Sequence, residues 1–255
     1  MTYKRTTVQG IEHHTDRLMF LTLAKPEGFT FKSGQFVRVA LPVTDAPQNE
    51  EDWLGRAYSL ASTPDEDVLC FYIAKVADGA LSPRLFELQV GDEVFVDENA
   101  YGFLQTDRLE PHGTLLCLAS GTGLASFLSI VKNNPWSRFD NVMVVHCVRS
   151  ADEVSLRDRF EKAAKDQGHE VNFRFIAATT RESDPARAGE ITCRLPQAIE
   201  EGFFEKIGFD LTPERVRVMV CGNPPFVKAL TDLFKARGFK SPRGATLGTF
   251  INENF

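Results

Sequence analysis

The sequence lacks the features that mark several classes of protein. It has no apolar run near the ~18 residues that span a bilayer, and its first residues, "MTYKRTTVQG", lack the apolar core of a signal peptide. Its five cysteines are scattered and form no C-x-x-C pair, and its five histidines show no metal-ligand spacing. We therefore expect a cytoplasmic protein with no metal site and no membrane partner.

Basic residues are also too few for one broad class of partner. Lys and Arg number 29 against 35 Asp and Glu, which leaves a formal net charge of −6. Nucleic-acid binding favours a basic surface, so we expect no nucleic-acid partner. Hydrophobic residues at 43% and charged residues at 25% are ordinary for a globular protein. A chain of 255 residues suits one large domain or two domains of about 100–150 residues each.

The first hundred residues are typical of antiparallel β structure. Short runs rich in β-branched and aromatic residues occupy 17–24, 34–41, 56–62, 68–76 and 92–97. Turn-forming stretches separate these runs, and the spacing predicts a barrel or sandwich. One short helix is predicted over 82–88, with Ser82 as N-cap and Pro83 at the first helical position.

The pattern changes after residue 105. Near-continuous apolar runs, typical of strands buried on both faces, occupy 114–120, 141–148, 171–179 and 215–222. Helices are predicted over 150–168, opened by a capping box of Ser150 and Glu153, and over 224–238. Strand–helix alternation predicts an α/β domain with a parallel sheet. We therefore place a β domain at 1–105 and an α/β domain at 106–255.

Ligands of open α/β sheets bind beyond the carboxyl ends of the strands. The first such end carries "SGTGLASFL" (120–128), a G-x-G turn entering a helix. Ser126 stands where the dinucleotide fingerprint has its third glycine, and no acidic residue ends the next strand. This stretch alone fits a plain tight turn as well as a ligand loop.

Arginines follow the second and third strands of this domain. Arg149 and Arg181 stand at these strand ends, and Arg194 follows in "GEITCR". A single exposed arginine is usually a solvated charge, but three together favour a phosphate, which guanidinium groups bind bidentately. A 2′-phosphate, hence NADP, would explain arginines where an NAD enzyme places a carboxylate. Cys221, in "CGNPP", is either a packed core thiol or a functional group at this edge.

In the β domain, "RAYS" (56–59) carries the most chemistry. On a strand, Arg56 and Tyr58 share one face and Ser59 points to the other. The arginine could hold a diphosphate, the tyrosine could stack on a flat ring, and the serine could bind a ring nitrogen. "DGALSPRL" (78–85) supplies a turn and a helix start that could bind an anion. An ordinary barrel strand and a helix cap would explain the same residues.

Taken together, these motifs resemble the ferredoxin–NADP reductase family, in its bacterial FAD-containing type. R-x-Y-S, "FYIAKV", "DGxLSPRL", "GTG", "HCVR", "TRE", "CGNPP" and a terminal aromatic occur in order along nearly the whole chain. The resemblance implies a six-stranded antiparallel FAD-binding β-barrel, followed by a five-stranded parallel α/β domain that binds NADP and whose C-terminal tail returns to the flavin. One departure is Ser126, where the family often has proline.

The resemblance also implies roles for individual residues. Those implied at FAD are Arg56, Ala57, Tyr58, Ser59, Tyr72, Ile73, Ala74, Lys75, Ala80, Leu81, Ser82 and Phe255. Thr122 is implied near the flavin–nicotinamide junction, and Arg149, Arg181 and Arg194 are implied on the 2′-phosphate side of NADP(H). Three are implied as catalytic: Ser59 near flavin N5, Cys221 beside the hydride-donating carbon, and Phe255 stacked on the isoalloxazine opposite Tyr58.

The function that the resemblance implies is electron transfer. A flavoenzyme would take a hydride from NADPH onto FAD and pass single electrons, reversibly, to ferredoxin or flavodoxin. We expect it to act as a monomer. Two alternatives stay open: a reductase component of an oxygenase system, and a non-catalytic flavin or dinucleotide sensor, because fold alone does not prove function.

Overall fold

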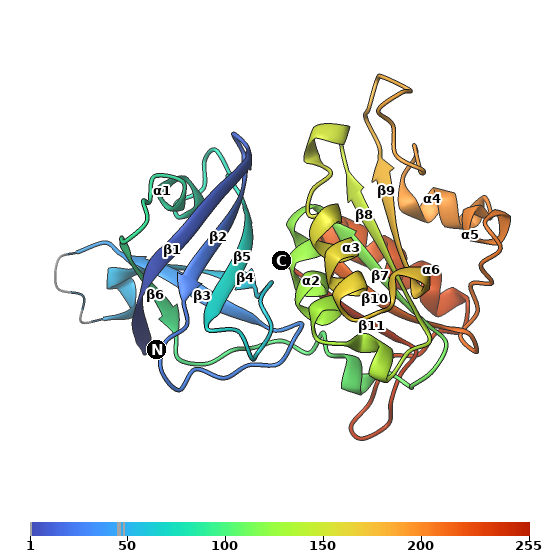
Figure 1. Ribbon diagram of the computed structural model, residues 1–255, viewed down its shortest axis with the longest axis horizontal. Helices are drawn as coiled ribbons and strands as arrows, with labels where there is room; N and C mark the ends of the chain where they lie inside the picture. Colours follow the sequence, from blue (N-terminus) through green and yellow to red (C-terminus); the bar gives the residue numbers. More distant parts are fainter. Residues whose placement is uncertain (1, 45–46, 48) are drawn as a thin grey trace. The chain divides into compact units, whose positions relative to one another are not determined.

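The computed structural model describes residues 2–44, 47 and 49–255, in two compact units (Figure 1). The units are Met1–Phe103 and Leu104–Phe255. The division thus falls between residues 103 and 104, two residues before the predicted boundary between 105 and 106. The ligand assigned to each domain stays a prediction.

The first unit is built on a six-stranded antiparallel sheet. Its strands are β1 (Tyr3–Thr15), β2 (Leu18–Ala24), β3 (Phe36–Pro42), β4 (Trp53–Ser59), β5 (Val68–Ala74) and β6 (Glu93–Asp97), in the order β4-β3-β6-β1-β2-β5. The antiparallel fold class is confirmed. An isolated bridge joins Leu60, the residue after β4, to Phe71 of β5, and full closure into a barrel stays a prediction.

Strand β1 was not among the predicted runs. Over its 13 residues only Thr6 and Val8 are buried, so it carries no apolar run that a sequence pattern could reveal. Its place comes from pairing, since it hydrogen-bonds to both β2 and β6. Local composition therefore understated the strand content of this unit.

The predicted helix over 82–88 is wrong in length and in its cap. Helix α1 (Ser82–Leu85) has four residues, Leu81 is its N-cap, and Ser82 is its first helical residue. The Ser82 hydroxyl instead accepts the N–H of Val76 at 2.9 Å. The Ser82 hydroxyl therefore stabilises the turn before the helix and does not cap the helix itself.

The second unit is built on a five-stranded parallel sheet, as predicted. Its strands are β7 (Thr114–Ser120), β8 (Asn141–Val148), β9 (Phe173–Thr179), β10 (Val216–Gly222) and β11 (Phe250–Asn254), in the order β11-β10-β7-β8-β9. Sequence patterns predicted the first four. Strand β11 is short and mostly polar, and it is a strand because it pairs with the edge of β10.

Helices pack on both faces of this sheet (Figure 1). They are α2 (Leu124–Lys132), α3 (Arg157–Asp166), α4 (Leu195–Glu200), α5 (Phe203–Lys206) and α6 (Pro224–Ala236). Val220 packs in a core with α4 and α6, so its neighbour Cys221 points to the other face, toward α2.

Single 3₁₀ turns occur in both units. They occupy Glu50–Asp52 in the first unit, and Thr106–Arg108, Gly121–Gly123, Pro135–Ser137, Ala151–Glu153 and Glu170–Asn172 in the second.

The predicted capping box at the start of α3 is wrong. Ser150 precedes a 3₁₀ turn and makes no side-chain cap, and α3 begins only at Arg157, after Leu156 with φ 60°. Glu153 instead accepts the backbone N–H of Arg149 at 3.0 Å. Its carboxylate therefore holds the end of β8 rather than a helix start. Helix α6 agrees with the prediction, and Asn223 caps it by accepting the N–H of Phe226.

Among the described residues, no helix combines the length and apolarity needed to cross a bilayer. Within the same ranges, no group of three or more His, Cys, Asp or Glu side chains is placed to hold a metal ion.

Candidate functional site

In the first unit, β4 carries the residues expected at a flavin ring and its diphosphate. Arg56, Ala57, Tyr58 and Ser59 lie on this strand, opposite Val39, Arg38, Val37 and Phe36 of β3. Tyr58 meets Phe71 edge-on, with ring centroids 6.5 Å apart. Burial raises the pKa of Tyr58 to about 12, and the Arg56 charge offsets this only in part. Tyr58 is therefore a neutral, half-buried aromatic ring, suited to packing on a flat ligand.

The expected flavin residues 72–75 lie on β5 and directly after it, and not all of their side chains can reach a ligand. Ile73 is fully buried in the core of the first unit, and Tyr72 is 3% exposed. Ala74 and Lys75 are partly exposed, and the Lys75 ammonium lies 5.5 Å from the centre of the Phe86 ring. Of these four expected residues, Ile73 can therefore contact a ligand only through its main chain.

The turn before α1 presents donors suited to a diphosphate. In the described part of the chain, no acceptor is present for the backbone N–H groups of Ala80, Leu81 and Ser82. Leu81 is 1% exposed and fixes the turn in the core. Because the Ser82 oxygen accepts from Val76, its own hydrogen stays available to donate. Three consecutive donors fit the oxygens of a dinucleotide diphosphate.

In the second unit, the Gly121–Gly123 turn joins β7 to α2. Its two glycine positions require glycine for different physical reasons. Gly121 has φ +54°, which other residues rarely adopt. A Cβ on Gly123 would lie 2.6 Å from the Cys221 carbonyl oxygen, so only glycine lets the turn approach β10 this closely. The expected nucleotide residue Thr122 lies between them. Both positions of the turn therefore require glycine, one for its backbone conformation and one for its close approach to β10.

Side chains connect the ends of β7 and β10 beneath this turn. The Ser120 hydroxyl accepts the backbone N–H of Asn223 at 3.1 Å and its side-chain amide at 3.0 Å. Ser126 Oγ lies 3.8 Å from Cys221 Sγ. Cys221 is 1% exposed, and burial raises the pKa of its thiol to about 12, although contact with Ser126 lowers it in part. The thiol is neutral, which excludes a thiolate nucleophile at ordinary pH.

The three expected arginines are exposed and gather around the ends of β8 and β9. The N–H of Arg181 donates to the carbonyl of Arg149 at 2.7 Å, so these two residues are neighbours. Ile191 bridges in parallel to Ala178, and Arg194 and Arg181 each follow this bridge by three residues. The segments that lead to Arg181 and Arg194 therefore run side by side at this bridge, although 12 residues lie between the two arginines in sequence.

The loops that carry these arginines are braced against each other. The Glu182 carboxylate accepts the N–H groups of Ala151 at 2.9 Å and Asp184 at 3.1 Å. These bonds lower the pKa of Glu182, and the ion pair with Asp152 raises the pKa of Arg187. The loops after β8 and β9 are therefore held together before any ligand binds.

Phe255 follows β11 and lies next to the end of β10. Its N–H donates to the carbonyl of Gly222 at 3.3 Å, and its side chain is 56% exposed. Glu253 pairs with Cys221, and Asn254 pairs with Gly222. The structure thus places the backbone of Phe255 beside Gly222, the residue that follows Cys221.

Comparison with known proteins agrees with this geometry. Residues 117–232 match the family model described as an oxidoreductase NAD-binding domain. The chain is 34% identical to ferredoxin–NADP reductase A of Sorangium cellulosum, over 98% of its own length and 89% of that relative. It is 36% identical to the flavodoxin/ferredoxin–NADP reductase of Escherichia coli, over 87% of its length and 85% of that relative. The chain belongs to the ferredoxin–NADP reductase family.

A solved structure of the family has the same fold. The ferredoxin NADP+ reductase of Neisseria gonorrhoeae, solved with bound FAD and NADP, superimposes with a TM-score of 0.87 at 31% identity. The match covers 99% of this chain and 98% of that chain. The identification made from the ordered motifs is therefore confirmed, while the role of each residue stays a prediction.

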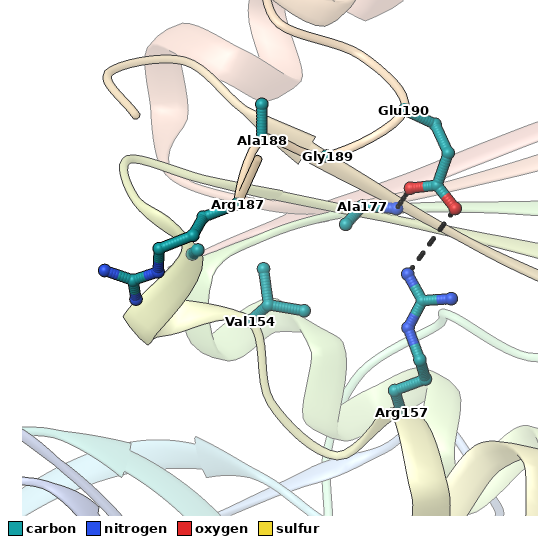
Figure 2. A pocket seen from close by; sticks show the side chains of 8 residues that line it. Val154, Arg157, Ala177, Arg187, Ala188, Gly189 and Glu190 are labelled. Carbon is teal, nitrogen blue, oxygen red and sulfur yellow. Dashed lines mark hydrogen bonds and ion pairs between the residues drawn. The ribbon is translucent and has the colours of Figure 1, made fainter. Parts of the chain in front are cut away.

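This family member also has a cavity that sequence reasoning missed (Figure 2). Its volume is about 380 Å³, and it is lined by Ala151, Val154, Arg157, Ala177, Arg187, Ala188, Gly189 and Glu190. Glu190 accepts the N–H of Ala177 at 2.8 Å and pairs with Arg157 at 3.6 Å. None of the expected NADP(H) residues lines it. Arg187 could have been noticed, because it follows the same strand as Arg181 in "DPARAGE".

Proposed function

We propose that this chain is an NADPH-oxidising flavoenzyme that takes a hydride onto FAD and passes single electrons to ferredoxin or flavodoxin. One observation carries the proposal: relatives with this activity in their names match nearly the whole chain, including both units. FAD and NADP(H) are the cofactors, in keeping with the related structure that contains both. A cytoplasmic location and a monomeric state belong to the same proposal.

The residues of the first unit fit FAD. Arg56 supplies a cation and Tyr58 a neutral ring, and the free N–H groups of the turn before α1 supply donors for a diphosphate. Ser59 would hydrogen-bond the ring near its N5. The bound flavin supplies the change from a two-electron donor to one-electron acceptors. The residues bind it and fix its orientation.

The residues of the second unit fit the nucleotide that donates the hydride. The first turn of α2 leaves N–H groups without intrahelical acceptors, which suits a diphosphate at Thr122 and its neighbours. Arg149, Arg181 and Arg194 would hold the 2′-phosphate. Cys221 would orient the nicotinamide as a neutral thiol, because the reaction requires no covalent adduct.

The flavin should be FAD and not FMN. Flavin released by heat is expected to run as FAD on chromatography, because the donors of Ala80, Leu81 and Ser82 are positioned for a diphosphate, which FMN lacks. Arg56→Ala should weaken FAD by about 10-fold or more, since one charge-assisted contact contributes roughly 1.5–3 kcal/mol. Arg38→Ala, on the paired strand β3, is the matched control. Release of FMN, or no flavin after reconstitution, would disprove the assignment.

Phe255 should act as a displaceable cover on the flavin. Phe255→Ala is expected to shift the flavin absorbance and to tighten NADP+ binding by about 2- to 10-fold, since aromatic stacking contributes roughly 0.5–1.5 kcal/mol. Discrimination against NADH should weaken as well, because the nicotinamide no longer competes with the ring. Absorbance titration and NADH turnover measure these effects.

Phe255→Tyr is the matched control for this prediction, since it keeps an aromatic ring and should behave like the parent protein. If the spectrum, NADP+ affinity and NADH turnover of Phe255→Ala are all unchanged, Phe255 has no place on the flavin.

The activity itself is tested in two stages. NADPH oxidation with an artificial acceptor separates an enzyme from a non-catalytic flavin sensor. Addition of purified ferredoxin or flavodoxin then separates this function from that of an oxygenase reductase component. Electron transfer to neither carrier, with turnover of the artificial acceptor intact, would refute the proposed acceptors and leave the flavoenzyme assignment standing.

A further inference from the structure

A buried histidine lies beneath the Gly121–Gly123 turn and has no part in the function described above. His146 is on β8, is fully buried, and pairs with Ala119 of β7 and Ala177 of β9. Its neighbour Val145 belongs to the core shared with α4 and α6, so His146 points to the face covered by α2. Burial of an imidazole among apolar strands is costly unless the ring makes a hydrogen bond.

The ring meets the turn directly. His146 Nε2 lies 3.1 Å from the carbonyl oxygen of Gly121, a residue 25 positions earlier in the chain. Because a carbonyl oxygen can only accept, Nε2 carries the hydrogen and donates it. The ring of Phe175 packs edge-on against the imidazole, at 6.3 Å between centroids, and limits its rotation. The donor is therefore fixed in position and aimed at the turn.

Gly121 is the residue of the turn whose conformation is least favourable for other amino acids, with φ +54°. Its carbonyl also accepts the N–H of Leu124 at the start of α2. A second donor from β8 on the same oxygen fixes the peptide plane between Gly121 and Thr122. The direction of the following N–H groups, which would face a nucleotide diphosphate, depends on that plane.

We propose that His146 is a positioning residue for NADP(H): through its hydrogen bond to Gly121 it holds the Gly121–Gly123 turn in the conformation that binds the nucleotide. This inference rests on the proposed function, because it requires that the turn binds NADP(H). His146 touches neither the nucleotide nor the flavin, so its loss affects nucleotide binding and leaves FAD bound.

The test compares two substitutions of His146. His146→Leu removes the donor, whereas His146→Gln places an amide N–H near the position of Nε2. His146→Leu should raise the Kd for NADP+ by about 3- to 10-fold, the size expected for one lost hydrogen bond. His146→Gln should restore the affinity to within about threefold of the parent protein. FAD content, flavin absorbance without nucleotide, and Tm are measured on the same samples.

A matched control is His169, whose ring stacks on Trp136 at 4.7 Å between centroids. His169 precedes β9, so it lies at the amino ends of the strands, away from the Gly121–Gly123 turn at their carboxyl ends. His169→Leu should leave the Kd for NADP+ unchanged. The inference is overturned if His146→Leu binds NADP+ like the parent, or if folded His146→Gln binds as weakly as His146→Leu.

A measurement on the unsubstituted holoenzyme guards against variants that fail to fold. With ¹⁵N-labelled histidine, the Nε2–H resonance of His146 should shift on addition of NADP+ and saturate together with the flavin difference spectrum. An unmoved resonance at saturating NADP+ also overturns the inference. If the unsubstituted protein neither binds NADP+ nor oxidises NADPH, the proposed function fails, which is a different result.

Discussion

Arg181→Ala and Arg194→Ala are each expected to lower kcat/KM for NADPH by about 10- to 100-fold, while kcat/KM for NADH changes by no more than about twofold. Each guanidinium would form a charge-assisted contact with the 2′-phosphate, worth roughly 1.5–3 kcal/mol. NADH lacks that phosphate, so it should not sense the loss. Both side chains are exposed, and each follows the Ala178–Ile191 bridge by three residues.

The matched control for these variants is Arg174→Ala. Arg174 is also exposed, but it lies near the amino end of β9, away from the strand ends that carry Arg181 and Arg194. Its replacement should change neither nucleotide. Equal losses with NADH and NADPH in Arg181→Ala would show that this arginine does not recognise the 2′-phosphate.

Cys221→Ser should keep FAD bound and slow flavin reduction by NADPH by on the order of tenfold, equivalent to about 1.4 kcal/mol of activation free energy. The Cys221 thiol is neutral and buried beside Ser126, 3.8 Å away. A serine hydroxyl is smaller and hydrogen-bonds more strongly to Ser126, so the nicotinamide would lose a polarizable surface held in a fixed position. Stopped-flow absorbance measures the rate directly.

Cys117→Ser is the control for the cost of burying a hydroxyl. Cys117 lies on β7, adjacent to β10, and is equally buried, and burial likewise raises the pKa of its thiol. Its replacement should lower stability without a matching loss of rate. Because the pKa of Cys221 is near 12, its rate profile should show no step from this thiol below about pH 10. Equal reduction rates in the parent and Cys221→Ser would leave Cys221 as core packing.

Buried strands were the elements that the sequence predicted best. The runs at 114–120 and 141–148 coincide with β7 and β8, because strands covered on both faces need continuous apolar residues. Strands β1 and β11 were not predicted, because they are strands through pairing with β6 and β10 rather than through a continuous apolar run. The caps expected at Ser82 and Ser150 were wrong for a related reason. At Ser82 and Glu153 the side-chain oxygen instead accepts an N–H that lies outside the predicted helix.

The candidate residues show a similar division. The sequence named Arg149, Arg181 and Arg194, because arginines at the ends of parallel strands favour phosphate. It did not predict the bridge between Ala178 and Ile191, or that Glu182 joins the loops after β8 and β9. These contacts join residues from separate loops, and local patterns carry no information on which loops meet.

By itself, the sequence determined the family, the antiparallel and parallel fold classes, and the kinds of side chain available for FAD and NADP(H). Composition, periodicity and ordered motifs are properties of the chain, and they persist whichever neighbours it acquires. Only the tertiary structure decided that His146 donates to Gly121, that Cys221 is neutral and buried against Ser126, and that Phe255 lies at the end of β10. Each of these depends on segments distant in sequence, because hydrogen bonding and desolvation act over a few ångströms in space and take no account of separation along the chain.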